Sequence, residues 1–459
     1  MASPMRNVLE NFEISPPIAS VQATTLPLTF LDIPWLLFSP TQPLFFYDFP
    51  HSNSHFRDSI LPALKTSLSL ALQYYFPLAG NLVTPPRPAR PFLSCSGGDF
   101  VVLTVSESAG NFHGLSGHHQ RDAVDFHRLV PEFPAAAHSS PLLAVQITLF
   151  AQNGISIGFS LRNVASDERT FDQFLKTWAA IFKVGIELHR PVLSKSVPIY
   201  DRSVIQDSGG VYPILLEEWW RFRDSHSLTG PGPDDPMVRA TFTMGRPEME
   251  IIKSWILIRS KKLFGSTHLL LSPYVLTCAY LWFCLMKTTG SGSNVHKPIE
   301  QTELRYFGFI AGGLTRLDYP VPRSYVGNCV AFGRATARQN ELTGDNGVVF
   351  AAKAIGDTIK KLDEDVLGGA ENWISDWSVF SGPGPHVMVT GSPKVDLYGL
   401  DFGWGRPKKI EEISIDRTHA VSLCESRDII GGIEIGLTLP KPKMDAFASL
   451  FNEGLKSLL

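Results

Sequence analysis

The sequence predicts an α/β protein of two similar-sized domains, each built from a mixed sheet flanked by helices. Its 459 residues exceed what one hydrophobic core usually organises, which favours two domains. Segments with apolar residues at alternate positions are interspersed with segments in which they recur every three or four residues. A stretch rich in glycine and proline, without clear periodicity, separates two such series. We therefore place an N-terminal domain at 1–190, a crossing linker at 191–236 and a C-terminal domain at 237–459.

The first half is expected to begin with extended segments and a helix. Residues 25–29 and the aromatic run to position 46 are broken by prolines, which is typical of extended chain between turns. Apolar residues then recur at every fourth position between 60 and 72, which predicts an amphipathic helix ending near Phe76.

An alternating pattern follows and predicts a pair of strands. Apolar residues occupy every second position in 145–149 and again in 155–161, and Asn153-Gly154 between them is a strong hairpin signal. Apolar residues from Phe171 to Phe182, Trp178 among them, then share one helical face, which we interpret as core rather than as a substrate platform. The turn at 163–169 thus joins a strand to a helix, a place where chemistry commonly sits in α/β folds.

The second half continues the mixture of helices and strands. A short helix is expected at 215–223, a strand at 238–243 and a helix after Pro247. Ser272-Pro273 has the residues of an N-cap and a first helical position. The apolar segment 269–286 that follows is marginal in length for a membrane span and contains polar residues, so we predict a buried helix and no membrane association.

Composition narrows the classes of partner. Hydrophobic residues make up 44% and charged residues 19%, as in ordinary globular proteins. The net charge of −3 provides no basic field for nucleic acid or anionic lipid. Five cysteines without CxxC spacing predict reduced thiols, no metal site and a cytoplasmic location, and we expect no signal segment.

Two motifs in the second half carry a family resemblance. Residues 401–405 read Asp401-Phe402-Gly403-Trp404-Gly405, and residues 325–329 read Tyr-Val-Gly-Asn-Cys. The first matches the DFGWG signature, and the second is similar to the YFGNC motif, of BAHD acyl-CoA-dependent acyltransferases. Residues 26–37 and 74–81 also resemble family segments, so the resemblance covers essentially the whole chain. The YFGNC motif is typical of the subgroup that acylates anthocyanins and other phenolic glycosides.

This resemblance implies a chloramphenicol acetyltransferase-like fold with a tunnel between its two domains. It also implies transfer of an acyl group, malonyl or hydroxycinnamoyl, from acyl-CoA as co-substrate to a sugar hydroxyl of a flavonoid or other phenolic glycoside. No permanently bound cofactor and no metal are expected, and the protein is expected to be a monomer.

The resemblance also assigns roles to particular residues. The 401–405 loop would hold the domains together rather than catalyse, and Arg316 is the candidate partner for Asp401. Ser272, Lys261 and Lys262 are candidates to meet the phosphates of CoA, although a helix cap with solvated lysines explains them equally well.

The family's HxxxD motif should lie at the strand–helix turn, but its histidine is absent. The turn reads Asn163-Val-Ala-Ser-Asp167, so Asn163 marks the position of the family base and Asp167 the orienting aspartate. Histidine suits proton abstraction because its pKa lies near neutrality, whereas an asparagine amide can hold a hydroxyl but cannot take its proton. Two further departures lie nearby: Glu168 replaces the usual glycine, and residues 312–317 keep only Arg316 of a DCRxRL-like stretch.

Three explanations of Asn163 are open from the sequence. It could be an engineered change, a natural divergence with lost or altered chemistry, or a sign that another base is used. The histidines to consider are His118, His119, His386 and His419. The rival functions are a ligand-binding pseudoenzyme and a catalyst of a CoA-independent reaction such as a cyclisation.

Overall fold

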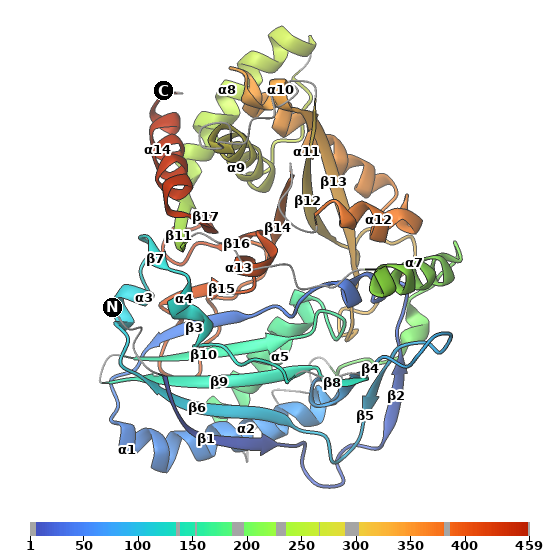
Figure 1. Ribbon diagram of the computed structural model, residues 1–459, viewed down its shortest axis with the longest axis vertical. Helices are drawn as coiled ribbons and strands as arrows, with labels where there is room; N and C mark the ends of the chain where they lie inside the picture. Colours follow the sequence, from blue (N-terminus) through green and yellow to red (C-terminus); the bar gives the residue numbers. More distant parts are fainter. Residues whose placement is uncertain are drawn as a thin grey trace.

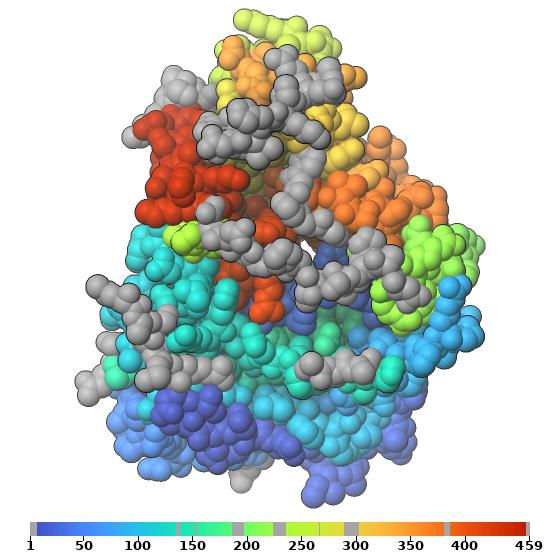
Figure 2. Space-filling model, viewed as in Figure 1, coloured from blue at the N-terminus to red at the C-terminus, as the bar shows by residue number. Residues whose placement is uncertain are grey.

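The computed structural model describes residues 6–134, 138–151, 154–185, 197–225, 236–265, 267–289, 303–380 and 386–457. Two large sheets, one from each half of the chain, lie one above the other (Figure 1). In the space-filling view the first half, blue to cyan, forms the lower part of the molecule and the second half, yellow to red, forms the upper part (Figure 2). The predicted α/β architecture with mixed sheets is confirmed.

The first sheet has six strands, of which β6 and β9 pair in parallel and the others are antiparallel. In spatial order they are β1 (Arg6–Ile14), β6 (Val101–Ser108), β9 (Leu143–Phe150), β10 (Gly154–Leu161), β3 (Pro43–Asp48) and β15 (Lys409–Glu412). Helices α2 (Leu61–Tyr74) and α5 (Glu168–Val184) pack beside each other against one face. Phe159 of β10 contacts the rings of Phe171 and Trp178 of α5, which fixes the helix on the sheet.

The second sheet has seven strands and is covered by four long helices. Its order is β13 (Val330–Arg338), β12 (Leu304–Gly312), β14 (His386–Thr390), β16 (Val421–Glu425), β17 (Ile433–Pro440), β11 (Met237–Met244) and β7 (Arg121–Asp122). The helices are α8 (Arg246–Phe264), α9 (Pro273–Thr289), α11 (Gly347–Glu364) and α14 (Lys441–Ser457). A small third sheet contains β2 (Thr24–Pro27), β5 (Phe92–Cys95), β4 (Asn81–Val83) and β8 (Ser139–Pro141).

The remaining elements are short, apart from α7 (Val211–Ser225), which packs against α12 (Trp373–Ser378). The other short helices are α1 (Asn53–His55), α3 (Phe112–Leu115), α4 (Val124–His127), α10 (Gln339–Thr343) and α13 (Ile415–Thr418). Single turns of 3-10 helix lie at Ile33–Leu37, Phe76–Ala79, Arg202–Val204 and Ala370–Asn372, and a π-helical turn lies at Phe56–Ile60.

Each large sheet includes one strand from the other half of the chain. The second-half strand β15 pairs with β3 in the first sheet, with Ile410 opposite Phe45. In return, the first-half strand β7 pairs with β11 in the second sheet, with Arg121 opposite Arg239. The division at 191–236 stays a prediction, and residues 191–196 and 226–235 of that linker lie outside the described part.

The strongest sequence patterns agree with the structure. The strands at 145–149 and 155–161 are β9 and β10, and the helices at 60–72, 171–182 and 215–223 are α2, α5 and α7. Ser272 caps α9 as expected, because its hydroxyl accepts the Val275 amide at 3.3 Å. The hairpin residue Asn153 lies outside the described residues.

Polar and apolar residues alternate along β9 and β10, but the polar ones do not face solvent, because both strands are buried on both faces. Some of the buried polar side chains are hydrogen-bonded inside the protein: Gln146 of β9 donates to Thr148 at 2.9 Å, and the hydroxyls of Thr148 and of Ser106 on β6 are 3.0 Å apart. A second apolar cluster, including Phe46, Phe112 and Phe126, covers the face opposite α5. Helix α9 is likewise enclosed, and no helix in the described ranges is long and apolar enough to cross a membrane.

Candidate active site

A cavity of about 510 Å³ lies where the two halves meet. Its wall includes Trp35, Phe45, Asn163, Glu168 and Phe171 from the first half, and Ile310, Arg316, Asn328, Glu411 and Cys424 from the second. Pockets that bind small molecules typically have this volume and combine apolar walls with a few convergent polar groups. The cavity can therefore hold an aromatic molecule next to the strand–helix turn that the sequence singled out.

Asp167 shapes that turn. It is the N-cap of α5, with φ −73° and ψ 169°, and its Oδ1 accepts the Thr170 amide at 2.9 Å. Its Oδ2 accepts the Cys329 amide at 3.2 Å. The carboxylate therefore stabilises the start of α5 and joins it to the 325–329 motif, while its neighbours Asn163 and Glu168 face the cavity.

Asn328 and Asp32 hold the same turn from behind. The Asn328 side-chain NH₂ donates to the Asn163 carbonyl at 3.0 Å and to Asp32 Oδ1 at 3.0 Å. Asp32 is fully buried and also accepts the amide and hydroxyl of Thr29, each at 2.7 Å. Three stretches far apart in sequence are thus joined by side-chain-to-backbone hydrogen bonds, which fixes the backbone position of Asn163.

The orientation of the Asn163 side chain follows from its partner. Its NH₂ group donates to the Ser39 carbonyl at 3.1 Å, and a carbonyl can only accept, so the nitrogen must occupy that side. The Asn163 side chain lines the cavity, and its amide oxygen is not used in the bond to Ser39. An amide oxygen can accept a hydrogen bond from a substrate hydroxyl but cannot carry a proton away.

Glu168 is the first residue of α5 and reaches the cavity from the same turn. Burial, followed by the negative charge of Glu412, raises the pKa of this carboxyl to about 8, against a partly compensating hydrogen bond from the Ser392 amide. The helix N-terminus favours an anion by ~0.3–1 kcal/mol, which is less than one pKa unit, so burial outweighs it. Glu168 therefore titrates close to neutral pH inside the cavity.

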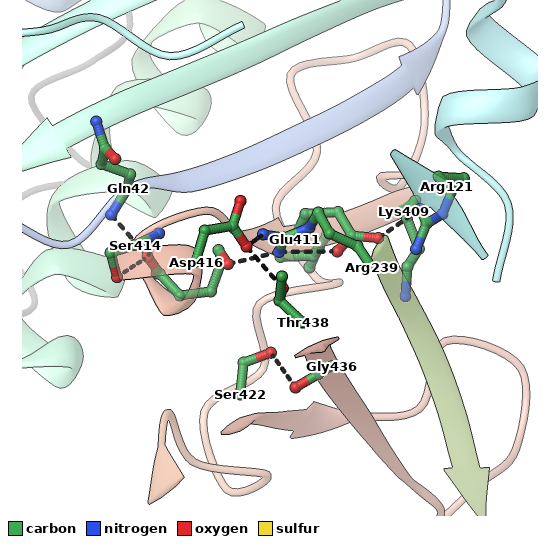
Figure 3. A network of polar contacts seen from close by, with 12 residues as sticks. Gln42, Arg121, Arg239, Lys409, Glu411, Ser414, Asp416, Ser422, Gly436 and Thr438 are labelled. Carbon is green, nitrogen blue, oxygen red and sulfur yellow. Dashed lines mark hydrogen bonds and ion pairs between the residues drawn. The ribbon is translucent and has the colours of Figure 1, made fainter. Parts of the chain in front are cut away.

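A buried network of charges reaches the cavity wall through Glu411 (Figure 3). Arg121 Nη1 lies 2.7 Å from Glu411 Oε1, and Arg239 Nη2 lies 3.2 Å from Glu411 Oε2, while Arg239 also pairs with Asp416. Although burial opposes it, these arginines and Lys409 hold the pKa of Glu411 at about 2. Because Arg121 comes from β7 and Glu411 from β15, the network joins the two exchanged strands.

Glu412 belongs to the same region but is held by uncharged donors. Its Oε1 accepts the backbone amide of Gln42 at 2.7 Å, the backbone amide of Ser414 at 3.1 Å and the Ser414 hydroxyl at 2.6 Å. Burial nevertheless raises the pKa of Glu412. The hydrogen bonds from Ser414 and Gln42 partly offset this effect of burial.

The 401–405 loop is built as a tight turn around Asp401. Its Oδ1 accepts the amides of Gly403 at 2.7 Å and Gly405 at 2.9 Å, and both glycines have φ above +100°. Phe402 is fully buried against Trp178, and Trp404 stacks on Phe402. None of these five residues is among the described residues that line the cavity.

The expected pairing of Asp401 with Arg316 is wrong. Asp401 Oδ2 accepts from Lys183 Nζ of α5 at 2.8 Å, whereas Arg316 Nε donates to Asp363 Oδ1 at 2.6 Å. Arg316 instead lines the cavity. The loop sits against the C-terminal end of α5, where a lysine from the helix's last turn reaches it, and sequence separation gave no signal of that proximity.

The other predicted residues lie away from the cavity lining. Ser272 caps α9, and Lys261 and Lys262 are exposed in the last turn of α8, so their role toward CoA stays a prediction. His118, His386 and His419 do not line either described cavity, and His119 lines a separate one of about 290 Å³. Burial, with the charge of His419, lowers the pKa of His386 to about 4.

Among the described residues, no group of three or more His, Cys, Asp or Glu is arranged to hold a metal ion. The charged residues of the cavity wall that the sequence did not single out include Arg169, Lys394, Glu411 and Glu412. Glu168 was visible in the sequence only as a departure from a glycine, and its titration near neutrality depends on burial that a sequence does not reveal.

Comparison with known proteins places the chain in a family. The model of the Transferase family matches residues 10–453. The chain is 36% identical to a malonyl-coenzyme A:anthocyanin 3-O-glucoside-6''-O-malonyltransferase of Dahlia pinnata, covering 99% of both proteins. It is also 36% identical to phenolic glucoside malonyltransferase 1 of Nicotiana tabacum (99% and 100% covered) and to a coumaroyl-CoA:anthocyanidin 3-O-glucoside-6''-O-coumaroyltransferase of Arabidopsis thaliana (98% and 97%).

Solved structures agree on the fold. Vinorine synthase superposes with a TM-score of 0.68 at 18% identity, over 99% of this chain and 98% of that one. TRI101 of F. sporotrichioides, in complex with coenzyme A and T-2, gives 0.64 at 15% identity, over 92% and 96%. These structures confirm the chloramphenicol acetyltransferase-like fold. The family model, which matches residues 10–453, shows that the chain belongs to the Transferase family, the BAHD acyltransferases.

Proposed function

We propose that the protein transfers an acyl group from a CoA thioester to a sugar hydroxyl of a phenolic glycoside, with acyl-CoA as co-substrate and no permanently bound cofactor. The observation that carries the proposal is the placement of the 163–168 turn in the wall of a cavity between the two halves. The relatives are named as malonyl- and coumaroyltransferases of anthocyanin and phenolic glucosides, which supports the substrate class. The family resemblance implies a monomer, and the sparse, unpaired spacing of the cysteines favours a cytoplasmic location.

The cavity suits such an acceptor. Trp35, Phe45 and Phe171 offer apolar walls for a phenolic ring, while Asn163 and Thr315 offer polar atoms for a sugar. The reaction needs the acceptor hydroxyl beside the thioester carbonyl, so binding both substrates in one cavity supplies part of the rate through proximity.

The test is a survey of donors and acceptors with the purified protein. Malonyl-CoA and p-coumaroyl-CoA are each offered with a panel of flavonoid glucosides, and free CoA thiol and the ester product are measured by a thiol reagent and mass spectrometry. We expect CoA release that depends on the glucoside and an ester on its sugar. The matched control is the aglycone of each glucoside, which lacks the sugar and should give no product.

The second candidate is a binding protein, and the asparagine at the position of the family base favours it. Binding of a glucoside or CoA ester by calorimetry, with no turnover of any pair, would replace the proposed function with this one. A product formed without any CoA ester would instead indicate a CoA-independent reaction.

A further inference from the structure

The cavity contains several groups that could in principle accept a proton. Those with carboxyl or thiol side chains are Asp167, Glu168, Cys329, Glu411, Glu412 and Cys424. Asp167 is committed to two backbone amides, and Glu411 to two buried arginines. Burial raises the pKa of Cys329 to about 12 and that of Cys424 well above its usual value, so both thiols hold their protons at neutral pH.

Glu412 is also committed, because its carboxylate accepts three hydrogen bonds from Gln42 and Ser414. Glu168 differs from the rest of this set. It is half-buried, it lines the cavity, and it lies beside the negative Glu412 rather than beside an arginine partner. A carboxyl in this setting gains and loses a proton near neutral pH, as a general base requires.

Its position relative to Asn163 is also fixed. Both residues belong to one turn between β10 and α5, and Asp167, directly before Glu168, locks that turn through the Thr170 and Cys329 amides. The backbone carbonyl of Asn163 is held by Asn328. A hydrogen-bond acceptor and a titratable carboxyl therefore face the same cavity from one rigid segment.

We propose that Glu168 is the catalytic base of this protein and that Asn163 holds the acceptor hydroxyl for it, so that the base missing at position 163 is supplied five residues later. This inference rests on the proposed acyl-transfer function.

The reaction balances with these two groups. The Asn163 amide oxygen accepts a hydrogen bond that orients the acceptor hydroxyl, and Glu168 takes the hydroxyl proton as the oxygen bonds to the thioester carbonyl carbon. The tetrahedral intermediate then collapses, the carbon–sulfur bond breaks, and the leaving CoA sulfur receives the proton from the Glu168 carboxyl. The products are the ester and CoA thiol, and Glu168 returns to its ionised form.

The charges around Glu168 determine the pH dependence. The carboxyls that face it are Glu412 of β15, Glu425 of β16 and Asp172 one turn further along α5, and all three raise its pKa. The thiol of Cys424 is also close, and the cations in the cavity wall are Arg169, Arg316 and Lys394. Since the base must be ionised to act, turnover should rise with pH through about 8 and then level off.

The experiment compares kcat and its pH profile for the unaltered protein, Glu168→Gln, Asn163→His/Glu168→Gln and Asp172→Asn, each offered every donor–acceptor pair of the survey above. Glu168→Gln should lose ~10²–10⁴-fold in kcat and lose the rise near pH 8. The double variant should recover turnover, with a rise moved toward the ordinary histidine value of about 6.5. Asp172→Asn, which removes a carboxylate outside the cavity lining, should keep turnover with its rise moved to lower pH.

The outcomes separate the two proposals. If Glu168→Gln keeps full turnover and an unchanged pH profile, Glu168 is not the base, while the acyl-transfer function stands. If the double variant turns over and the unaltered protein does not, the inference fails and the site lacks only its base. If neither turns over with any pair, both proposals are overturned. Thermal unfolding at pH 6 and pH 9 shows whether Glu168→Gln is folded. This variant should be at least as stable as the unaltered protein at pH 9, where Glu168 carries a charge in the cavity wall.

Discussion

Replacing Arg239 by methionine tests whether the buried charge network holds the two large sheets together, because Arg239 belongs to β11 of the second sheet and Glu411 to β15 of the first. The guanidinium is 1% exposed and contacts Asp416, Glu411 at 3.2 Å and the Glu412 carbonyl at 2.6 Å. Methionine keeps most of the volume but leaves two carboxylates buried with fewer partners. Breaking a buried ion pair by removing one member costs about 3–5 kcal/mol, a large part of the ~5–15 kcal/mol that stabilises a typical protein.

The assay is urea unfolding followed by far-UV circular dichroism. For a chain with an m-value of about 3 kcal/mol/M, a loss of 3–5 kcal/mol lowers the midpoint by roughly 1–2 M. The matched control is Arg417→Met, because Arg417 pairs with Glu132 at an exposed site, where ion pairs contribute about 0–1 kcal/mol. Equal midpoints for the two variants would refute the reasoning that the network holds the exchanged strands. Neutralising Glu411 and Asp416 in the Arg239→Met background should recover part of the loss.

Three further predictions concern the turn, the loop and acid stability. Asp167→Ala should lower stability by ~1–2 kcal/mol in thermal denaturation, because α5 loses its cap and the Cys329 amide loses its acceptor; an unchanged melting temperature would contradict the role of the cap. Asp401→Ala should lower the free energy of unfolding by about 1–2 kcal/mol, and by more than Lys183→Met does. The reason is that the carboxylate accepts two loop amides, while the half-exposed ion pair contributes little. A larger loss in Lys183→Met would mean that the ion pair dominates. Glu411 has a pKa of about 2 in the folded protein and an ordinary value near 4.5 when unfolded, so its contribution is complete above pH 4.5 and is lost as the pH falls toward 2. The stability gap between the unaltered protein and Glu411→Gln should therefore narrow over that range in urea unfolding, and a constant gap would show that the ionisation is not coupled to folding.

Local sequence patterns predicted the secondary structure well where the conformation of a segment depends on residues close in the chain. The period-two pattern at 155–161 and the four-residue spacing from Phe171 placed β10 and α5, and with them the turn that carries Asn163 and Asp167. The role of Ser272 as a cap was similarly readable, because the cap involves only the four consecutive residues 272–275. These features rest on interactions within one or two turns of chain.

Interactions between distant segments were not readable in the same way. Lys183 rather than Arg316 meets Asp401, because the loop lies on the end of α5. Glu168 was recognisable only as an unusual residue, since its raised pKa comes from burial beside Glu412, a residue of the other half of the chain. From the sequence, the candidates for the catalytic base were position 163 and the histidines. The residues that line the cavity instead make Glu168 the candidate.

The exchange of strands also has a consequence for how the protein is made. The backbone amide of Gln42, directly before β3, donates a hydrogen bond to Glu412 of β15 across 370 residues of chain. At a synthesis rate of about 5–20 residues per second, the β3 edge waits roughly 20–70 s for its neighbour. During that time the edge presents Leu44, Phe45 and Phe46 with unpaired backbone groups, which is a template for pairing with another chain. Low yield and insolubility of C-terminally truncated chains ending before Lys409 would follow from this feature, and slower translation should increase the need for chaperones.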